Sequence, residues 1–168
     1  RTRTLAGWQL KLAAFVAFTW STFQMWHASP LPFLFKIGVF IDVPARGIHL
    51  CFGLLLCFIL FPIYKSRRGK NAPFTDFILA FGGGYCALYL YLEYVALVDR
   101  NGILLEVPLS IFGFTFTFPV ELLIGAAGIF VLLEATRRAI GLPLVIVAFI
   151  FLLYSFFGQS MPDLISHQ

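Results

Sequence analysis

Charged residues are scarce in this sequence of 168 residues. Aspartate, glutamate, lysine and arginine together make up 12% of it, whereas soluble globular domains carry roughly 25%. A soluble domain of this length needs polar residues along the outer faces of its helices, and here whole stretches are apolar all round. Hydrophobic residues fill 60% of the sequence, including 21 phenylalanines, and the mean hydropathy is +0.91. This balance indicates an integral membrane protein.

Cysteines and the common catalytic patterns are also sparse. Cys51, Cys57 and Cys86 are the three cysteines, and each falls within an apolar stretch, where thiols act as small hydrophobic residues. The run Gly82-Gly83-Gly84 has no Gly-Lys-Ser/Thr after it, so it does not indicate a phosphate-binding loop. No nucleophile, base and orienting group come together along the chain. We therefore expect neither an enzyme nor a cofactor or metal site.

Histidine leaves one alternative open. His27 and His49 fall near corresponding ends of the first two apolar stretches, where a shared haem or metal ion is conceivable. Neither histidine belongs to a Cys-x-x-Cys-His attachment motif. An unrelated small membrane subunit, such as a haem-bearing component of an electron-transfer complex, is the alternative interpretation, and a Soret absorbance would distinguish it.

Five apolar stretches carry the main fold prediction, since a membrane-spanning helix needs about 20 apolar residues. We expect transmembrane helices at Trp8 to His27, Gly47 to Tyr64, Phe74 to Val98, Phe118 to Leu133 and Ile140 to Phe157. The predicted fold class is all-α integral membrane. A four-helix transmembrane domain would occupy residues 1–139, and a fifth, connector helix would lie within residues 140–168, with interfacial segments between helices.

The cationic residues predict the orientation of these helices. They gather at Arg1 and Arg3, from Lys65 to Lys70, and at Arg137 and Arg138. By the positive-inside rule these ends are cytoplasmic, so we expect a cytoplasmic N-terminus and a periplasmic end after the fifth helix. The net charge of +4 then reflects topology and contact with anionic lipid, and no nucleic-acid partner is expected.

Two connections are too long and too apolar to be simple loops. They run from Ser29 to Asp42 and from Ile103 to Pro119. Exposed backbone is not tolerated in hydrocarbon, so each segment should lie along the outer interface as an amphipathic piece or be buried against protein. A further membrane span in the second connection is the alternative, although Glu106, Pro108 and Gly113 interrupt it.

Acidic residues near the helix ends are the candidate structural or interface positions. Glu134 precedes Arg137 and Arg138 by three and four residues, which predicts ion pairing at the cytoplasmic boundary. Glu93 lies close to the outer end of the third stretch, where we expect a snorkelling or satisfied carboxylate. Glu121 follows Pro119 at a helix start, where a carboxylate complements the helix dipole. Small residues, such as Gly83 with Ala87, predict close helix packing.

Several segments together resemble a known family. The most specific runs from Leu132 to Pro143 (LLEATRRAIGLP); the others are FLLYSFFG at 151–158, Met161-Pro162, His167, Trp8-Gln9-Leu10, ASPLPF at 28–33 and Ile48-His49-Leu50. Over almost the whole chain, the sequence resembles the N-terminal part of fused TRAP-transporter permeases of the TAXI subclass. That part is similar to the Q-type small subunit of other TRAP transporters.

The resemblance implies a division of labour. In TRAP secondary transporters, a periplasmic substrate-binding protein captures an organic acid, a large membrane domain carries it with coupling cations, and a small four-helix domain scaffolds the large one. The resemblance therefore implies an accessory scaffold of the bacterial inner membrane, with the large domain, the binding protein and the lipid bilayer as partners. These 168 residues lack the large domain and its cation sites, so the chain is expected to be a fragment of a longer polypeptide.

Overall fold

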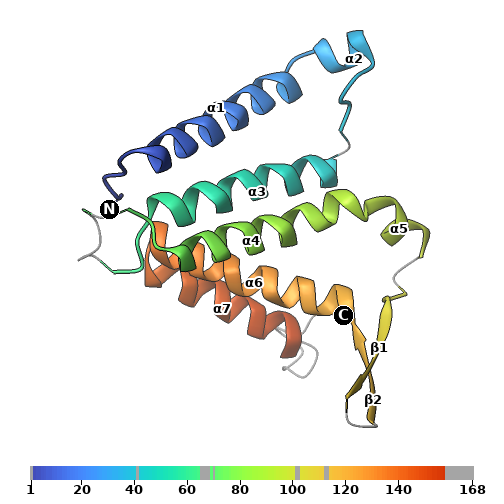
Figure 1. The fold of residues 1–168 in the computed structure, drawn as a ribbon. Coiled ribbons are helices and arrows are strands. Elements are labelled where there is room, and N and C mark those ends of the chain that lie inside the picture. Colours follow the sequence, from blue (N-terminus) through green and yellow to red (C-terminus); the bar gives the residue numbers. More distant parts are fainter. Residues whose placement is uncertain are drawn as a thin grey trace, which may run out of the picture.

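The computed structural model describes residues 2–40, 42–64, 69, 71–100, 103–111 and 114–157. Long helices dominate the described residues, and successive ones run in opposite directions (Figure 1). They are α1 (Trp8–Ala28), α3 (Asp42–Leu60), α4 (Phe74–Leu92), α6 (Val120–Ala139) and α7 (Leu142–Phe157). The shorter elements are α2 (Leu31–Phe35), α5 (Tyr94–Asp99), β1 (Glu106–Ile111) and β2 (Phe114–Pro119).

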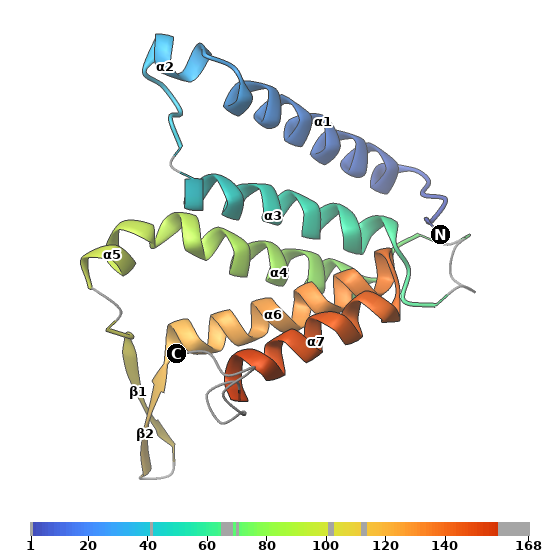
Figure 2. The same ribbon diagram turned by 180° about the vertical axis from the view of Figure 1, so that it is seen from behind.

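This alternation gathers the connections at two opposite ends. At one end lie the start of α1, the end of α3, the start of α4 and the α6–α7 turn; we call it the basic end, because Arg3, Arg137 and Arg138 are there. At the other lie α2, α5 and the two strands; we call it the hairpin end (Figure 2). The predicted basic connection from Lys65 to Lys70 lies outside the described residues, apart from Gly69.

Helix α3 is the centre of the packing. It packs most extensively on α4, and α1 and α6 also contact it. Its main core cluster joins Cys51, Leu54 and Phe58 to Ala80 and Ala87 of α4 and Ala135 of α6. A second cluster joins Leu56 and Ile59 to Ala13 of α1. Both clusters hold small residues on one side of the contact, which lets the helix backbones approach closely.

The close packing predicted from small residues of α4 is confirmed. A Cβ atom on Gly83 would lie 2.5 Å from Val131 Cγ1 of α6, and one on Gly84 would lie 3.2 Å from Cys51 Sγ of α3. No larger residue fits at Gly83 without a shift of its neighbours.

The predicted helices are present with changed boundaries. Helix α3 begins at Asp42 and ends at Leu60, so it lies several residues earlier than the predicted stretch. The third stretch is divided, because the backbone leaves helical geometry at Glu93 (φ −102°, ψ 8°) between α4 and α5. Helix α6 continues to Ala139, past the predicted end at Leu133. The end of the connector segment, residues 158–168, lies outside the described residues.

The second long connection corrects the all-α prediction. It forms an antiparallel β-hairpin in which Glu106 pairs with Pro119 and Ile111 pairs with Phe114, so it is not a further membrane-spanning helix. The cause is visible in the sequence, where phenylalanine alternates with threonine from Phe114 to Phe118 at the two-residue period of a strand. β-Branched and aromatic residues also favour strands over helices.

The first long connection holds the short helix α2. Its residues Phe33, Leu34 and Phe35 are exposed, and the chain leaves α2 through Lys36 in the left-handed conformation (φ 54°). The segment is therefore a single helical turn with an apolar surface at the hairpin end.

Membrane-spanning potential is concentrated in α3. Among the described residues, α3 is the one helix long and apolar enough to cross a bilayer, judged by length and composition, and α7 is apolar but only 16 residues long. The remaining predicted spans stay predictions.

Large apolar side chains cover much of the outer surface. On α1 the side chains of Phe15, Phe18 and Met25 are exposed, and on α6 that of Phe130 is exposed. Over its described length α7 has no buried residue, although it packs along α6. Soluble monomers rarely expose contiguous apolar surface on this scale, so another apolar phase or partner is expected to cover it.

Candidate functional site

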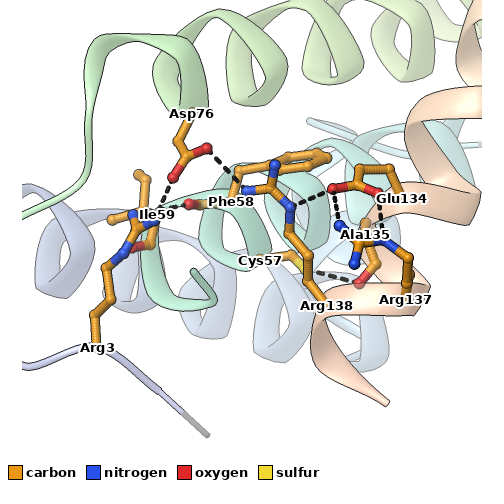
Figure 3. Close-up of polar contacts among 9 residues, drawn as sticks. All are labelled: Arg3, Cys57, Phe58, Ile59, Asp76, Glu134, Ala135, Arg137 and Arg138. Carbon is orange, nitrogen blue, oxygen red and sulfur yellow. Dashed lines mark hydrogen bonds and ion pairs between the residues drawn. The ribbon is translucent and has the colours of Figure 1, made fainter. Parts of the chain in front are cut away.

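The most elaborate polar arrangement is a buried ion network at the basic end, centred on Asp76 (Figure 3). Asp76 is in the first turn of α4, and its side chain is 3% exposed. Its Oδ1 accepts a hydrogen bond of 2.9 Å from Arg138 Nη1, and its Oδ2 accepts one from Arg3 Nη2. One carboxylate thus joins the N-terminal segment to the end of α6.

Arg3 ties the N-terminal segment to the end of α3. Its side chain is fully buried, and Nη1 donates to the carbonyl oxygens of Phe58 at 3.5 Å and Ile59 at 3.3 Å. Its backbone N–H donates to the carbonyl of Leu60 at 2.7 Å. The last carbonyls of a helix lack partners within the helix and carry partial negative charge, so a buried guanidinium satisfies them.

Arg138 connects this junction to Glu134. Its side chain is 1% exposed, Nε donates to Glu134 Oε1 at 2.7 Å, and the guanidinium carbon lies 4.9 Å from the centre of the Phe58 ring. Arg137 is more exposed and donates to both carboxylate oxygens of Glu134 at 2.7 and 2.8 Å. The ion pairs predicted from the spacing of Glu134, Arg137 and Arg138 are therefore present.

The charge of Glu134 is stabilised by its partners. Glu134 lies just after the predicted span that ends at Leu133. The hydrogen bonds from Arg137 lower the pKa of the Glu134 carboxyl. Partial burial opposes this effect, and Arg138 reinforces it. Because ionised Glu134 bonds both arginines, its side chain links the partly exposed guanidinium of Arg137 to the buried one of Arg138.

Arg3 and Asp76 are not among the site residues that the sequence predicts. Asp76 stands two residues into α4 within a run of apolar residues, and an ionisable residue so placed is by default a structural or functional position. That signal was available for Asp76. Arg3 carried none beyond its charge, because its partners are 55 to 73 residues away in the chain.

Two further contacts hold the N-terminal segment at the basic end. Buried Gln9 donates to the carbonyl of Ala72 at 3.1 Å and accepts from its N–H at 2.7 Å. The backbone N–H of Ala6 donates to Asn71 Oδ1 at 3.1 Å. The start of α1 is therefore fastened to the segment that leads into α4.

A smaller polar junction lies at the hairpin end. Glu121 is in the first turn of α6, as predicted, and its Oε1 accepts from Arg100 Nη1 at 2.7 Å. Its Oε2 accepts from the backbone N–H of Leu105 at 2.7 Å, just before β1. Glu121 thus fixes the base of the hairpin as well as complementing the helix dipole.

Glu93 lies at the break between α4 and α5. Its backbone N–H donates to the carbonyl of Tyr89 at 2.9 Å, and its own carbonyl accepts from Leu97 at 2.8 Å. These bonds carry the helical path across the break. The half-buried side chain lies at the opposite end of α4 from Asp76. The structure therefore does not bring Glu93 together with Glu134, Arg137 and Arg138 in one site.

His27 and His49 line one small cavity of about 130 Å³ between α1 and α3. His49 Nδ1 is 3.2 Å from the donor Trp20 Nε1, and it also contacts Gln24 Nε2. Within the described ranges, no three histidine, cysteine, aspartate or glutamate side chains are grouped so that they could hold a metal ion.

The geometry of the Asp76 network is that of a structural joint. Three arginines and two carboxylates are paired with one another and with helix-end carbonyls, across four separate segments of the chain.

Comparisons with protein-family models, curated proteins and solved structures find no match to this chain.

Proposed function

We propose that this chain is the accessory scaffold domain of a TRAP-type secondary transporter of the TAXI subclass, in the bacterial inner membrane. The transporter would take up organic acids together with a periplasmic substrate-binding protein and a coupling cation. Transport itself would take place in a large membrane domain, with the present chain holding that domain in place. The family rests on the sequence resemblance, and the scaffold role also rests on the geometry.

The observation that carries the scaffold role is a contrast between polar and apolar surfaces. At the basic end, the charged groups of Arg3, Asp76 and Arg138 are buried and paired within the chain. Along α7 most of the large apolar side chains are exposed, from Leu142 to Phe157, and none is buried. A frame that satisfies its own charges and leaves an apolar helix open suits a role in holding another membrane domain.

The ion network supports the predicted orientation of the chain in the membrane. Arg3 and Arg138 come from opposite ends of the sequence and contact the same carboxylate, so both lie on one side of the molecule. The positive-inside rule makes that side cytoplasmic. It follows that the hairpin end is periplasmic, where a substrate-binding protein would dock.

Association with a large domain is the direct test. The chain would be co-expressed with a tagged large TRAP membrane domain of the TAXI subclass, solubilised in mild detergent and purified through the tag. We expect a stable complex of the two. A small membrane subunit unrelated to transporters serves as the control and should not co-purify. Failure to associate would contradict the scaffold role, and a Soret band in the purified chain would favour the haem-bearing alternative.

The isolated chain is expected to transport nothing. Its charged residues lie near helix ends, and the sequence has no pair of Gly/Pro-interrupted helices of the kind that forms a midplane transport site. Proteoliposomes that contain the chain and a binding protein should show no cation-driven uptake of organic acid. Liposomes that also contain the large domain are the positive control. Uptake by the chain without the large domain would overturn the proposal.

A further inference from the structure

The register of the β-hairpin separates its residues into two chemically different faces. Residues paired across an antiparallel ladder share a face, and neighbours along a strand alternate between faces. On one face the pairs are Val107 with Phe118, Leu109 with Phe116 and Ile111 with Phe114. All six of these positions hold a large apolar residue and none is charged.

The opposite face has a different composition. Its pairs are Glu106 with Pro119, Pro108 with Thr117 and Ser110 with Thr115. This face contains no large aliphatic or aromatic residue, and it carries Glu106, the one charged residue of the two strands. The hairpin is thus the strand counterpart of an amphipathic helix.

The hairpin extends sideways from the helices. In both views its strands run across the direction of the long helices, away from the start of α6 (Figures 1 and 2). A membrane that contained these helices would have its surface across their axes. The strands therefore run along the plane that such a surface would occupy at the hairpin end.

The base of the hairpin is fixed to α6. Leu105 donates its N–H to the Glu121 carboxylate at 2.7 Å and accepts the N–H of Val120 at 3.0 Å. Arg100 neutralises Glu121 at 2.7 Å. The depth of the hairpin along the helix axis is consequently set by the first turn of α6.

We propose that the apolar face of this hairpin lies in the outer lipid interface, at the boundary between headgroups and acyl chains. The inference rests on the proposed membrane placement of the helices, and it assigns a lipid surface, instead of a protein, as the partner of this segment. The polar face, with Glu106, turns toward the periplasm.

Continuity of the apolar surface favours lipid as the partner. Ile103, whose side chain is 73% exposed, and the exposed Leu104 and Leu105 lead into the apolar face. Leu122 and Leu123 of α6 are exposed beside the base. The hairpin face thus extends the apolar exterior of the helices, and a lipid layer that covers one also meets the other.

The interface also suits the backbone of a two-stranded hairpin. Within the described part of the chain the sheet has two strands, so each strand has an outer edge that pairs with no other strand. Unpaired edges of this kind are not tolerated within hydrocarbon. At the level of the headgroups, water and lipid polar groups bond these edges while one face stays apolar. A position deeper in the bilayer would leave them unsatisfied.

The test compares two neighbouring rungs of the ladder on opposite faces. Val107 and Thr117 are both exposed in the structure, and each would be changed to cysteine in the full chain with Cys51, Cys57 and Cys86 replaced by alanine. Each protein would be labelled with an environment-sensitive fluorophore and reconstituted into vesicles of phosphatidylethanolamine and phosphatidylglycerol. The quenching of the fluorescence by aqueous iodide would then be compared with its quenching by a lipid that carries a quencher near its headgroup.

We expect the probe at position 107 to show blue-shifted emission, quenching by the lipid quencher, and severalfold weaker quenching by iodide than the probe at 117. Equal access of iodide to both probes would overturn the inference. Shielding of position 107 only after addition of the large domain or binding protein would overturn it in favour of protein docking. If Val107→Cys does not reconstitute, Leu109→Cys tests the same face.

The failure of this inference is separable from that of the proposed function. If the chain resists extraction from the vesicles by alkaline carbonate and iodide reaches both probes, the hairpin assignment alone is wrong. If carbonate releases the chain, its membrane placement is wrong, and the hairpin assignment falls with it.

Discussion

At the scale of single residues, Asp76 is the position on which most of the basic end depends. Its carboxylate is the shared partner of two buried guanidinium groups, on Arg3 and Arg138. A buried ion pair adds little to stability compared with an apolar pair of the same shape, but removal of one partner leaves an uncompensated charge. The loss of Asp76 would remove the carboxylate that pairs with Arg3, and it would leave Arg138 with Glu134 as its remaining carboxylate partner in the network.

The first prediction contrasts two aspartates. Asp76→Asn should lower the free energy of unfolding by about 3–5 kcal/mol, because the network loses its central charge. Asp42→Asn is the matched control, since Asp42 pairs with Arg46 at 2.7 Å and is 75% exposed; it should cost less than about 1 kcal/mol. Thermal unfolding of the chain in detergent or nanodiscs measures both, and equal losses would count against a central role for Asp76.

The second prediction separates the adjacent arginines. Arg138→Ala should destabilise the chain far more than Arg137→Ala, because Arg138 is buried and bonds Asp76 and Glu134, whereas Arg137 is 36% exposed and bonds Glu134. A double-mutant cycle with Glu134→Ala should show that Glu134→Ala combined with Arg138→Ala costs less than the sum of the single changes. Additive losses would argue against direct coupling of Glu134 to the buried network.

The sequence predicted one part of this site and missed the other for a physical reason. Glu134, Arg137 and Arg138 are three and four residues apart on one helix, so their pairing follows from helical geometry alone. The contact of Asp76 with Arg138 spans 62 residues and depends on the packing of α4 against α6. Local spacing carries no information about such a contact.

At the scale of elements, the α4–α6 contact gives a third prediction. Gly83→Ala should destabilise the chain by about 1–3 kcal/mol, because its Cβ would approach the stiff Val131 side chain. Gly82→Ala is the control: apart from its chain neighbours and the nearby backbone of its own helix, no atom of the described residues lies within 4 Å of a Cβ placed there. A gain of up to about 1 kcal/mol from helix propensity is expected. Unfolding temperatures of both variants check this, and the reverse order would show that the contact is loose.

The elements themselves were predictable to different degrees. Long apolar stretches predicted the five long helices and their order, because length and composition suffice for that. The strands were not predicted, although Phe114 to Phe118 has a two-residue period, because a short apolar segment beside predicted spans also suits a helix or an interfacial segment. The break at Glu93 depends on backbone geometry that no single residue there specifies.

At the scale of the whole molecule, the alternation of five helices makes a prediction about sidedness. The network places Arg3 and Arg138 at one end, and five helices of alternating direction leave the chain at the opposite end after α7. In a membrane the cation-rich end should be cytoplasmic. The hairpin end and the exit of α7 should then both be periplasmic.

Reporter fusions test this prediction at several positions. Fusions at Arg1, between Lys65 and Lys70, and after Arg138 should report a cytoplasmic location, and fusions at Asp99 and after Gln159 should report a periplasmic one. The positive-inside rule also supplies a control. Neutral replacements of Arg137 and of the cations from Lys65 to Lys70 should weaken the preference of these connections for the cytoplasmic side without changing the helices. The fusion after Gln159 is decisive: a cytoplasmic reading there would mean an even number of crossings and would rule out five spans. A periplasmic reading there, together with a cytoplasmic reading after Arg138, would require that α7 crosses the membrane despite its 16 residues.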